Sequence, residues 1–177
     1  MFIHGSGSSR HSPRNQQVAA GLETAGLATL LFDLLTPPEE SFDLQTAQFR
    51  FNIPLLARRV VEVTDWIRTL TEFVEMPIGY FGASTGAAAA LVAATQRPHE
   101  VDAVVCRGGR PDLAGDSLGS VEAPTLLIVG SNDPETLKLN EQAVVQMRCE
   151  REMKIVRGAT HLFEEPGALE AVTQRAR

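Results

Sequence analysis

Gly82-Ala83-Ser84-Thr85-Gly86 stands between an apolar run, Ile78 to Phe81, and an alanine-rich segment that begins at Ala87. The run has the length and composition of a buried strand and the segment favours a helix, so the pentapeptide occupies a strand-to-helix turn. A serine between two glycines at such a turn is typical of a nucleophile elbow, where the sharp turn exposes the hydroxyl and a side chain at either glycine would clash. The alternative is a tight turn whose serine only caps the helix.

Outward from this turn, short apolar runs alternate with longer segments of helical period along the 177 residues. The alternation predicts one α/β domain of three layers, with helices on both faces of a mostly parallel sheet. About six strands are expected, at Phe2 to His4, Leu27 to Phe32, Ile78 to Phe81, Val101 to Cys106, Thr125 to Val129 and Met153 to Val156.

Five helices are expected between or after these strands. They open near Pro13, run from about Pro54 to Thr71, start at Ser84, run from about Glu135 to Met147, and run from about Pro166 onward. Two segments rich in proline, glycine and polar residues, Thr36 to Phe51 and Arg107 to Val121, predict long loops.

A serine hydroxyl is a poor nucleophile at neutral pH, so Ser84 needs a base within hydrogen-bond reach and a carboxylate that orients the base. Asp133 follows the strand that ends at Val129, and His161 follows the last strand. Both therefore fall at the carboxyl edge of the sheet, in the chain order Ser, Asp, His that the elbow motif predicts. Taken singly, an aspartate before a proline is as readily a turn or cap residue, and a loop histidine as readily a solvated one.

Other acids and histidines compete for these roles. Asp33 follows the second strand, and Asp112 and Asp116 lie in the loop after Cys106. Asp133 is preferred because its strand comes directly before that of the histidine. The other three histidines lie in or before loops that suit the role less well: His4, His11 and His99.

Acyl transfer also needs donors aimed at the developing oxyanion. One is the backbone N–H of Thr85, and the second is expected from the loop His4 to Arg10, which is rich in glycine and serine. Ser6 is the first choice within that loop and Gly7 the second. Phosphate binding is the alternative for such a loop, although its spacing fits neither a P-loop nor a dinucleotide fingerprint.

Arg107 and Arg110 flank a glycine pair after the fourth strand, at the edge where the site is expected. Such a fork could hold a carboxylate or phosphate of the substrate. The alternative, which we favour slightly, is that these arginines form salt bridges with nearby acids such as Asp112 and Asp116.

The composition narrows the classes of partner that the protein is expected to bind. The formal net charge of −6 is spread along the chain without a Lys/Arg block, so nucleic acid is not expected and a small-molecule substrate is. No apolar run approaches the length of a membrane span, and the first residues lack the pattern of a signal peptide. We therefore expect no membrane association and a cytoplasmic location, in which Cys106 and Cys149 stay reduced.

Several segments together resemble the dienelactone-hydrolase-like branch of the α/β-hydrolases. They are His4 to Arg10, Phe32 to Thr36, Gly82 to Gly86, Arg107 to Leu113 and Gly158 to Phe163. The resemblance implies an α/β-hydrolase fold without a large cap domain. It also implies a triad of Ser84, Asp133 and His161, with no cofactor and no metal.

The chain departs from this family in two ways. Dienelactone hydrolase proper uses a cysteine nucleophile, whereas the elbow here carries Ser84, so the lactone substrate does not follow from the name. The sheet of the family also begins with two further strands before the His-Gly loop, which are missing here. Leu27 to Phe32 would then lie at an open edge, which predicts either a homodimer that covers it or a natural start upstream of Met1.

The function expected from these observations is hydrolysis of an ester, thioester or lactone through a Ser-His-Asp triad and an acyl-enzyme. Transfer of the acyl group to an acceptor other than water would use the same residues. The alternative from another class is a binding or interaction module that keeps the hydrolase scaffold without catalysis.

Overall fold

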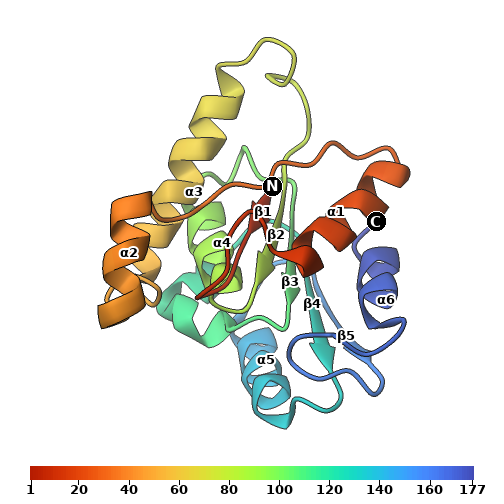
Figure 1. Cartoon of the computed structure of the whole chain (residues 1–177). Helices are drawn as coiled ribbons and strands as arrows, with labels where there is room; N and C mark the ends of the chain where they lie inside the picture. The colour runs from red at the N-terminus through yellow and green to blue at the C-terminus, as the bar shows by residue number, and fades with distance from the viewer.

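The computed structural model describes all 177 residues, and it confirms the three-layer α/β architecture (Figure 1). The sheet consists of five strands, and every neighbouring pair is parallel. In order across the sheet they are β1 (Phe2–Ile3), β2 (Gly79–Ala83), β3 (Ala103–Arg107), β4 (Thr125–Gly130) and β5 (Arg151–Val156). The spatial order is the same as the sequence order. Because all the strands run parallel, their carboxyl ends lie at one edge of the sheet.

Helices cover both faces of this sheet. On one face, α1 (Pro13–Thr24) and α6 (Ala168–Arg175) contact each other and bury a cluster of 12 residues. On the other face lie α3 (Ile53–Arg68), α4 (Thr85–Gln96), the 3-10 helix η1 (Pro111–Ser120) and α5 (Pro134–Gln146), over a cluster of 27 residues. Apart from η1, which lies in a segment predicted as a loop, each of these helices begins within a few residues of its predicted start.

The predicted strand from Leu27 to Phe32 is the main correction to the sheet. This segment pairs with β1 only through a single bridge, between Leu31 and Phe2, supported by a hydrogen bond from the Phe2 N–H to the Leu30 carbonyl. Its only neighbour is β1, which is two residues long and offers no ladder to extend. The segment therefore follows the edge of the sheet without becoming a full strand.

The edge beside this segment borders a broad apolar groove at the amino ends of the strands. The groove has a volume of about 1000 Å³, and the large apolar side chains that remain exposed along it include Leu27 and Trp66. A homodimer that covers this edge stays a prediction.

The two segments predicted as long loops contain helices. Within the first lies α2 (Pro37–Thr46), which begins with a capping box: the Thr36 N–H donates to Glu39, whose carboxylate also accepts from the Thr36 hydroxyl. Within the second lies η1, which is interrupted at Gly115 where the backbone turns to positive φ. Their proline and polar content suggested loops, whereas prolines at the first helical positions start these helices.

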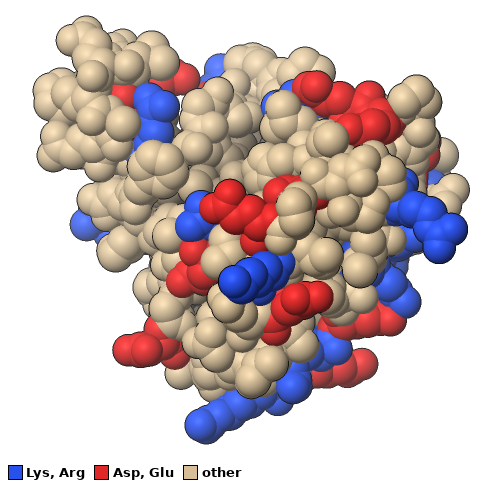
Figure 2. Space-filling model, turned by 90° about the horizontal axis from the view of Figure 1, so that it is seen from below, with Lys and Arg blue, Asp and Glu red and all other residues tan.

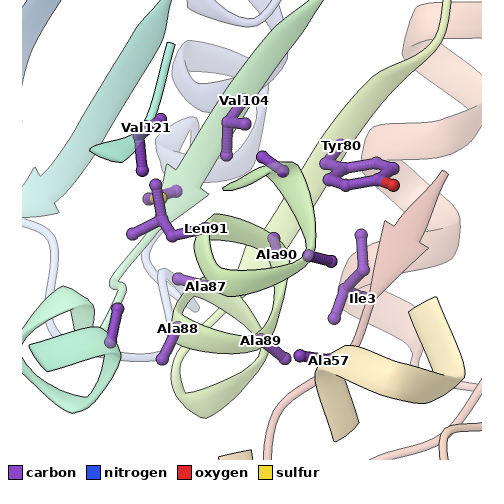
Figure 3. Close-up of a cluster of buried hydrophobic side chains, with 14 of the residues drawn as sticks. Ile3, Ala57, Tyr80, Ala87, Ala88, Ala89, Ala90, Leu91, Val104 and Val121 are labelled. Atoms are coloured by element: carbon purple, nitrogen blue, oxygen red, sulfur yellow. The ribbon is translucent and has the colours of Figure 1, made fainter. Parts of the chain in front are cut away.

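The centre of the larger core is the alanine-rich helix α4, shown end-on in Figure 3. Ala87 to Ala90 are fully buried, and Tyr80, Val104 and Leu91 fill the space around them. Small side chains let this helix lie close to the sheet, which fixes the position of its first turn relative to the strand ends.

Two glycines make this approach possible. A Cβ at Gly82 would lie 2.5 Å from the Cα of Ala87, and a Cβ at Gly86 would lie 2.2 Å from the carbonyl oxygen of Ile3. Both neighbours are backbone atoms that cannot move aside as a flexible side chain can. The glycines required by the elbow motif are therefore required here by direct contact of helix and strand.

We expect Gly86→Ala to lower the free energy of unfolding by about 3 kcal/mol or more, because the added methyl group must displace the β1 backbone. Urea unfolding followed by circular dichroism measures the change. The matched control is Gly79→Ala, whose Cβ would meet only the Ala103 carbonyl at 3.8 Å. If both variants lose the same stability, the close approach is not the constraint that we infer.

Candidate active site

Ser84 occupies the turn between β2 and α4. Its backbone has φ 50° and ψ −122°, a conformation that residues with side chains rarely adopt. Ser84 stands at the N-cap position of α4, but its hydroxyl makes no capping hydrogen bond. Backbone bonds hold the turn: the Ser84 N–H donates to the Arg107 carbonyl, and the Ser84 carbonyl accepts from the Ala87 and Arg110 N–H groups. The surrounding structure thus maintains a strained turn that presents the Ser84 hydroxyl.

The structure brings Ser84, His161 and Asp133 together. The Nδ1 atom of His161 lies 2.6 Å from Oδ2 of Asp133, and the Nε2 atom lies 3.3 Å from Oγ of Ser84. Because a carboxylate only accepts, Nδ1–H is the donor in the first contact. In the neutral imidazole, Nε2 is then the acceptor for the Ser84 hydroxyl. The geometry matches a nucleophile, a base and an orienting carboxylate.

Two loops position the acid and the histidine. Asp133 is the N-cap of α5, and its carboxylate accepts from the Thr136 N–H at 3.3 Å. The loop after β4 is tied to the loop that carries His161, because the Asn132 N–H donates to the Ala159 carbonyl at 2.9 Å. The reading of Asp133 as a cap residue and its reading as the partner of His161 are therefore both correct.

Asp133 is held in its ionised form. Burial raises its pKa, but hydrogen bonds from Thr136 and His161 outweigh the burial and hold the pKa below its usual value. The competing acids have other partners or lie in solvent: Asp33 pairs with Arg10, Asp112 pairs with Arg110, and Asp116 is exposed. Asp133 is the acid that reaches the histidine.

The loop after β1 lies directly against the elbow. A Cβ at Gly5 would approach the Cβ of Ser84 to 3.0 Å, so only glycine allows the loop to lie there. The Ser6 N–H, predicted as an oxyanion donor, donates at 2.8 Å to the hydroxyl of Thr85. The donor thus faces the elbow as expected, but a side chain of the protein accepts its hydrogen bond.

Some amides of this loop and of the residues after it are also engaged within the protein, whereas the Gly5, Gly7 and Ser9 N–H groups have no acceptor in the protein. The Ser8 N–H donates to the Gly5 carbonyl, the Arg10 N–H to Asp33, and the Ser12 N–H to the Ser9 carbonyl. Ser12 itself caps α1. The Gly7 N–H, the second choice as oxyanion donor, is thus without a partner in the protein.

His4 anchors the start of the loop. Its Nδ1 donates to the Gly5 carbonyl at 3.0 Å and its Nε2 accepts from the Leu34 N–H at 3.1 Å, which requires a neutral ring. Burial lowers the pKa of His4, while the Gly5 hydrogen bond and the charges of Asp33 and Glu40 oppose the shift. His11 and His99 are exposed and lie outside the site.

The two arginines predicted as a fork differ in their surroundings. Arg110 donates from Nε and Nη2 to the two carboxylate oxygens of Asp112, at 2.8 and 2.7 Å, so it forms the salt bridge of the alternative reading. Arg107 is 7% exposed, and its guanidinium contacts other residues of the protein.

Arg107 instead connects two segments that border the site. Its Nη2 donates to Asn15 of α1 at 3.2 Å, and its guanidinium lies 5.8 Å from the centre of the Phe163 ring, in the loop of His161. Its Nε is buried without a partner. Burial, together with the charge of Arg14, lowers the pKa of Arg107 to about 10.

A small cavity of about 60 Å³ lies between the loop after β1 and helix α2. Gly5, Ser6 and Leu34 line it on one side, and α2 contributes Asp43 and Leu44. Asp43 accepts from the Phe49 and Arg50 N–H groups and from Nε of Arg50, so it fixes the segment after α2. The sequence prediction missed this wall, although the spacing of Thr36 and Glu39 is a capping-box signal.

The face at the carboxyl ends of the strands carries acidic and basic side chains intermixed, without a large patch of one sign (Figure 2). No group of three or more His, Cys, Asp or Glu side chains is placed to hold a metal ion.

Cys106 and Cys149 are buried free thiols. None of the helices combines the length and the apolar character needed to cross a membrane.

The chain is similar to curated proteins by sequence and to solved structures by fold. No protein-family model matches the chain. Two strains of Mycobacterium tuberculosis have a protein, provisionally named a phosphoribosyl transferase, that is 59% identical over 178 residues. This match covers 99% of the chain but 39% of those proteins, so the chain spans well under half of their length.

The solved structures include a dienelactone hydrolase from Anabaena variabilis that is 57% identical, with a TM-score of 0.97. The match covers 99% of this chain and 81% of that one. Est1E from Butyrivibrio proteoclasticus is 16% identical, with a TM-score of 0.75 over 98% of this chain and 83% of its own, and shows likeness of fold alone.

The neutral state of His4 predicts a pH dependence of stability. Its folded pKa lies below the unfolded value near 6.5, so the unfolded chain takes up a proton that the folded chain resists as the pH falls through this value. The contribution of His4 to the free energy of unfolding is therefore complete above the unfolded pKa, and it is lost as the pH falls from the unfolded pKa toward the folded pKa. We expect His4→Gln to make the loss of stability between pH 7.5 and 5 shallower, as measured by urea unfolding at several pH values.

The control for this experiment is His99→Gln, which changes an exposed histidine away from the site. It should leave the pH dependence as in the unmodified protein. Equal slopes for His4→Gln and the unmodified protein would show that His4 is not the group responsible.

Proposed function

Because the chain belongs to the dienelactone-hydrolase-like branch of the α/β-hydrolases, we propose that it hydrolyses an ester, thioester or lactone with Ser84 as nucleophile. The observation that carries the proposal is the continuous series of contacts from Ser84 Oγ to His161 Nε2 and from His161 Nδ1 to Asp133. It links the hydroxyl, which is unreactive alone, to a base whose orientation is fixed.

Acylation follows from this geometry. His161 takes the proton of Ser84 through Nε2 as Oγ attacks the carbonyl carbon, and Asp133 stabilises the imidazolium that forms. The carbonyl oxygen becomes an oxyanion beside the free N–H of Thr85, at the N-terminus of α4. The tetrahedral intermediate then collapses, and the imidazolium gives its proton to the leaving alcohol, thiol or lactone oxygen.

Deacylation reverses these roles with water. The Nε2 of His161 takes a proton from water as the water oxygen attacks the acyl-enzyme. The second tetrahedral intermediate releases the acid, and Oγ of Ser84 recovers its proton from His161. Acyl transfer to an alcohol or amine would follow the same course with another nucleophile in place of water.

The two cysteines do not compete with Ser84. Burial raises the pKa of the Cys106 thiol to about 12, so almost none of it is thiolate at neutral pH. Cys149 is buried as well and lies near Thr125, away from the elbow. This supports serine chemistry in a branch whose name derives from an enzyme with a cysteine nucleophile.

The cavity next to the loop after β1 supports a substrate with a short group on this side, because about 60 Å³ accommodates only a few non-hydrogen atoms. Polar and charged side chains line much of it, including Asp33, Glu40 and Asp43. A short group therefore fits this side of the site better than a long acyl chain, and Arg50, which pairs with Asp43, also lines it.

Ser84→Ala should lower the rate of hydrolysis of p-nitrophenyl acetate by about 10³-fold or more, because the acyl-enzyme can no longer form. The same variant should lose labelling by a fluorophosphonate probe, which reacts only with an activated serine. Ser120→Ala, at an exposed serine, is the control and should keep both activities. Unchanged hydrolysis in Ser84→Ala would rule out this mechanism, and a protein without either activity would favour the binding module.

A further inference from the structure

We propose that the hydroxyl of Thr85 donates to the oxyanion beside the Thr85 N–H and that it relays the hydrogen bond of the Ser6 N–H to the reacting carbonyl oxygen. This inference rests on the proposed function of Ser84. Thr85 entered the sequence prediction only through its backbone N–H. The structure adds its side chain to the site.

The first observation is the position of the hydroxyl. Thr85 is the first residue of α4, directly after the nucleophile, and it is 2% exposed. Its Oγ1 accepts from the Ser6 N–H at 2.8 Å, across the gap between the elbow and the loop after β1. Because Gly5 lies against the Cβ of Ser84, this gap borders the point where the carbonyl of an acylated Ser84 must lie. The hydroxyl thus accepts from the loop donor next to Ser84, and on our proposal its own proton is directed to the oxyanion.

The second observation is that the proton of this hydroxyl has no acceptor in the protein. The contact with Ser6 is the only hydrogen bond of Thr85 Oγ1, and in it the oxygen accepts. Buried threonines inside helices donate to the carbonyl one turn earlier, as Thr64 does to Val60 at 2.8 Å and Thr173 to Leu169 at 2.9 Å. Thr85 begins its helix, so no helical turn precedes it. A buried hydroxyl with a free proton is available to a ligand.

The energetic consequence favours catalysis. A donor that lacks a partner in the free protein and gains one as the oxyanion forms stabilises the transition state more than the ground state, which raises kcat. The hydrogen bond accepted from Ser6 polarises the hydroxyl and strengthens its own donation. Threonine is stiff at χ1, so the hydroxyl is held at this place without a further contact.

The opposite reading is that the hydroxyl only occupies the Ser6 N–H and blocks it. The two readings predict changes of opposite sign in Thr85→Val, which keeps the shape of the side chain and removes the hydroxyl. If the hydroxyl is a donor, the variant loses it. If the hydroxyl is a block, the variant frees the Ser6 N–H to bind the oxyanion directly.

We expect Thr85→Val to lower kcat for p-nitrophenyl acetate by about 10²-fold, the usual effect of losing one oxyanion donor, with KM nearly unchanged. Thr85→Ser, which keeps the hydroxyl, should recover a large part of this loss. Inhibition by a boronic acid, which mimics the tetrahedral intermediate, should weaken across the two variants in parallel with kcat/KM. The matched control is Thr95→Val in the same helix, whose hydroxyl donates to the Val92 carbonyl and which should keep the activity of the unmodified protein.

A Thr85→Val variant that is folded by circular dichroism and as active as the unmodified protein, or more active, would overturn this proposal and leave Ser84 as the nucleophile. Equal losses in Thr85→Val and Thr85→Ser would also overturn it, because the variant that keeps the hydroxyl would then be no better than the variant that lacks it. An unmodified protein that neither hydrolyses esters nor reacts with fluorophosphonate would overturn the proposed function together with this inference.

Discussion

The carbonyl oxygens of Ile3 and His4 occupy the space where a side chain at position 86 would have to lie, at 2.2 and 2.5 Å from its Cβ. This contact between the first turn of α4 and the end of β1 sets the distance from helix to sheet. Gly82 permits the same close approach at β2, where a Cβ would lie 2.5 Å from the Cα of Ala87. With the helix so close, the chain reverses within one residue, and Ser84 takes up its strained conformation as a result. The position of the Ser84 hydroxyl is therefore a consequence of packing.

The rest of the site is built on loops that are joined mainly by backbone hydrogen bonds. The Ser84 carbonyl accepts from the Arg110 N–H, and the loop of Asp133 is bound to that of His161 through Asn132 and Ala159. Arg107 adds a contact between α1 and Phe163. A buried guanidinium without a carboxylate partner costs stability, which is tolerated more often at functional sites than elsewhere in a fold.

Much of this arrangement could be predicted from sequence because its signals are local. The elbow carries its own glycines, and Asp133 and His161 each follow an apolar strand. The prediction of a strand from Leu27 to Phe32 was wrong because it used composition alone. A strand also needs a partner to pair with, and β1 is too short to provide one. Helix α2 was missed because its prolines and acids also suit a loop.

The remaining features depend on contacts between distant residues. Arg107 and Arg110 are alike in sequence, but Arg107 points into the core and Arg110 reaches Asp112 two residues away. The hydrogen bond from the Ser6 N–H to the Thr85 hydroxyl joins residues 79 positions apart, and no local sequence pattern predicts it. Such contacts follow from the register of the parallel sheet, which sequence alone specifies only indirectly.

The same sequence separations bear on how the chain acquires its activity. His161 meets Ser84 across 77 residues and Asp133 across 28, so the site exists only after β2, β4 and β5 have taken their places. Ordering strands that are distant along the chain costs loop-closure entropy before their contacts repay it, which makes parallel sheets slow to form. The contacts among Ser84, Asp133 and His161 therefore form only in the completed sheet.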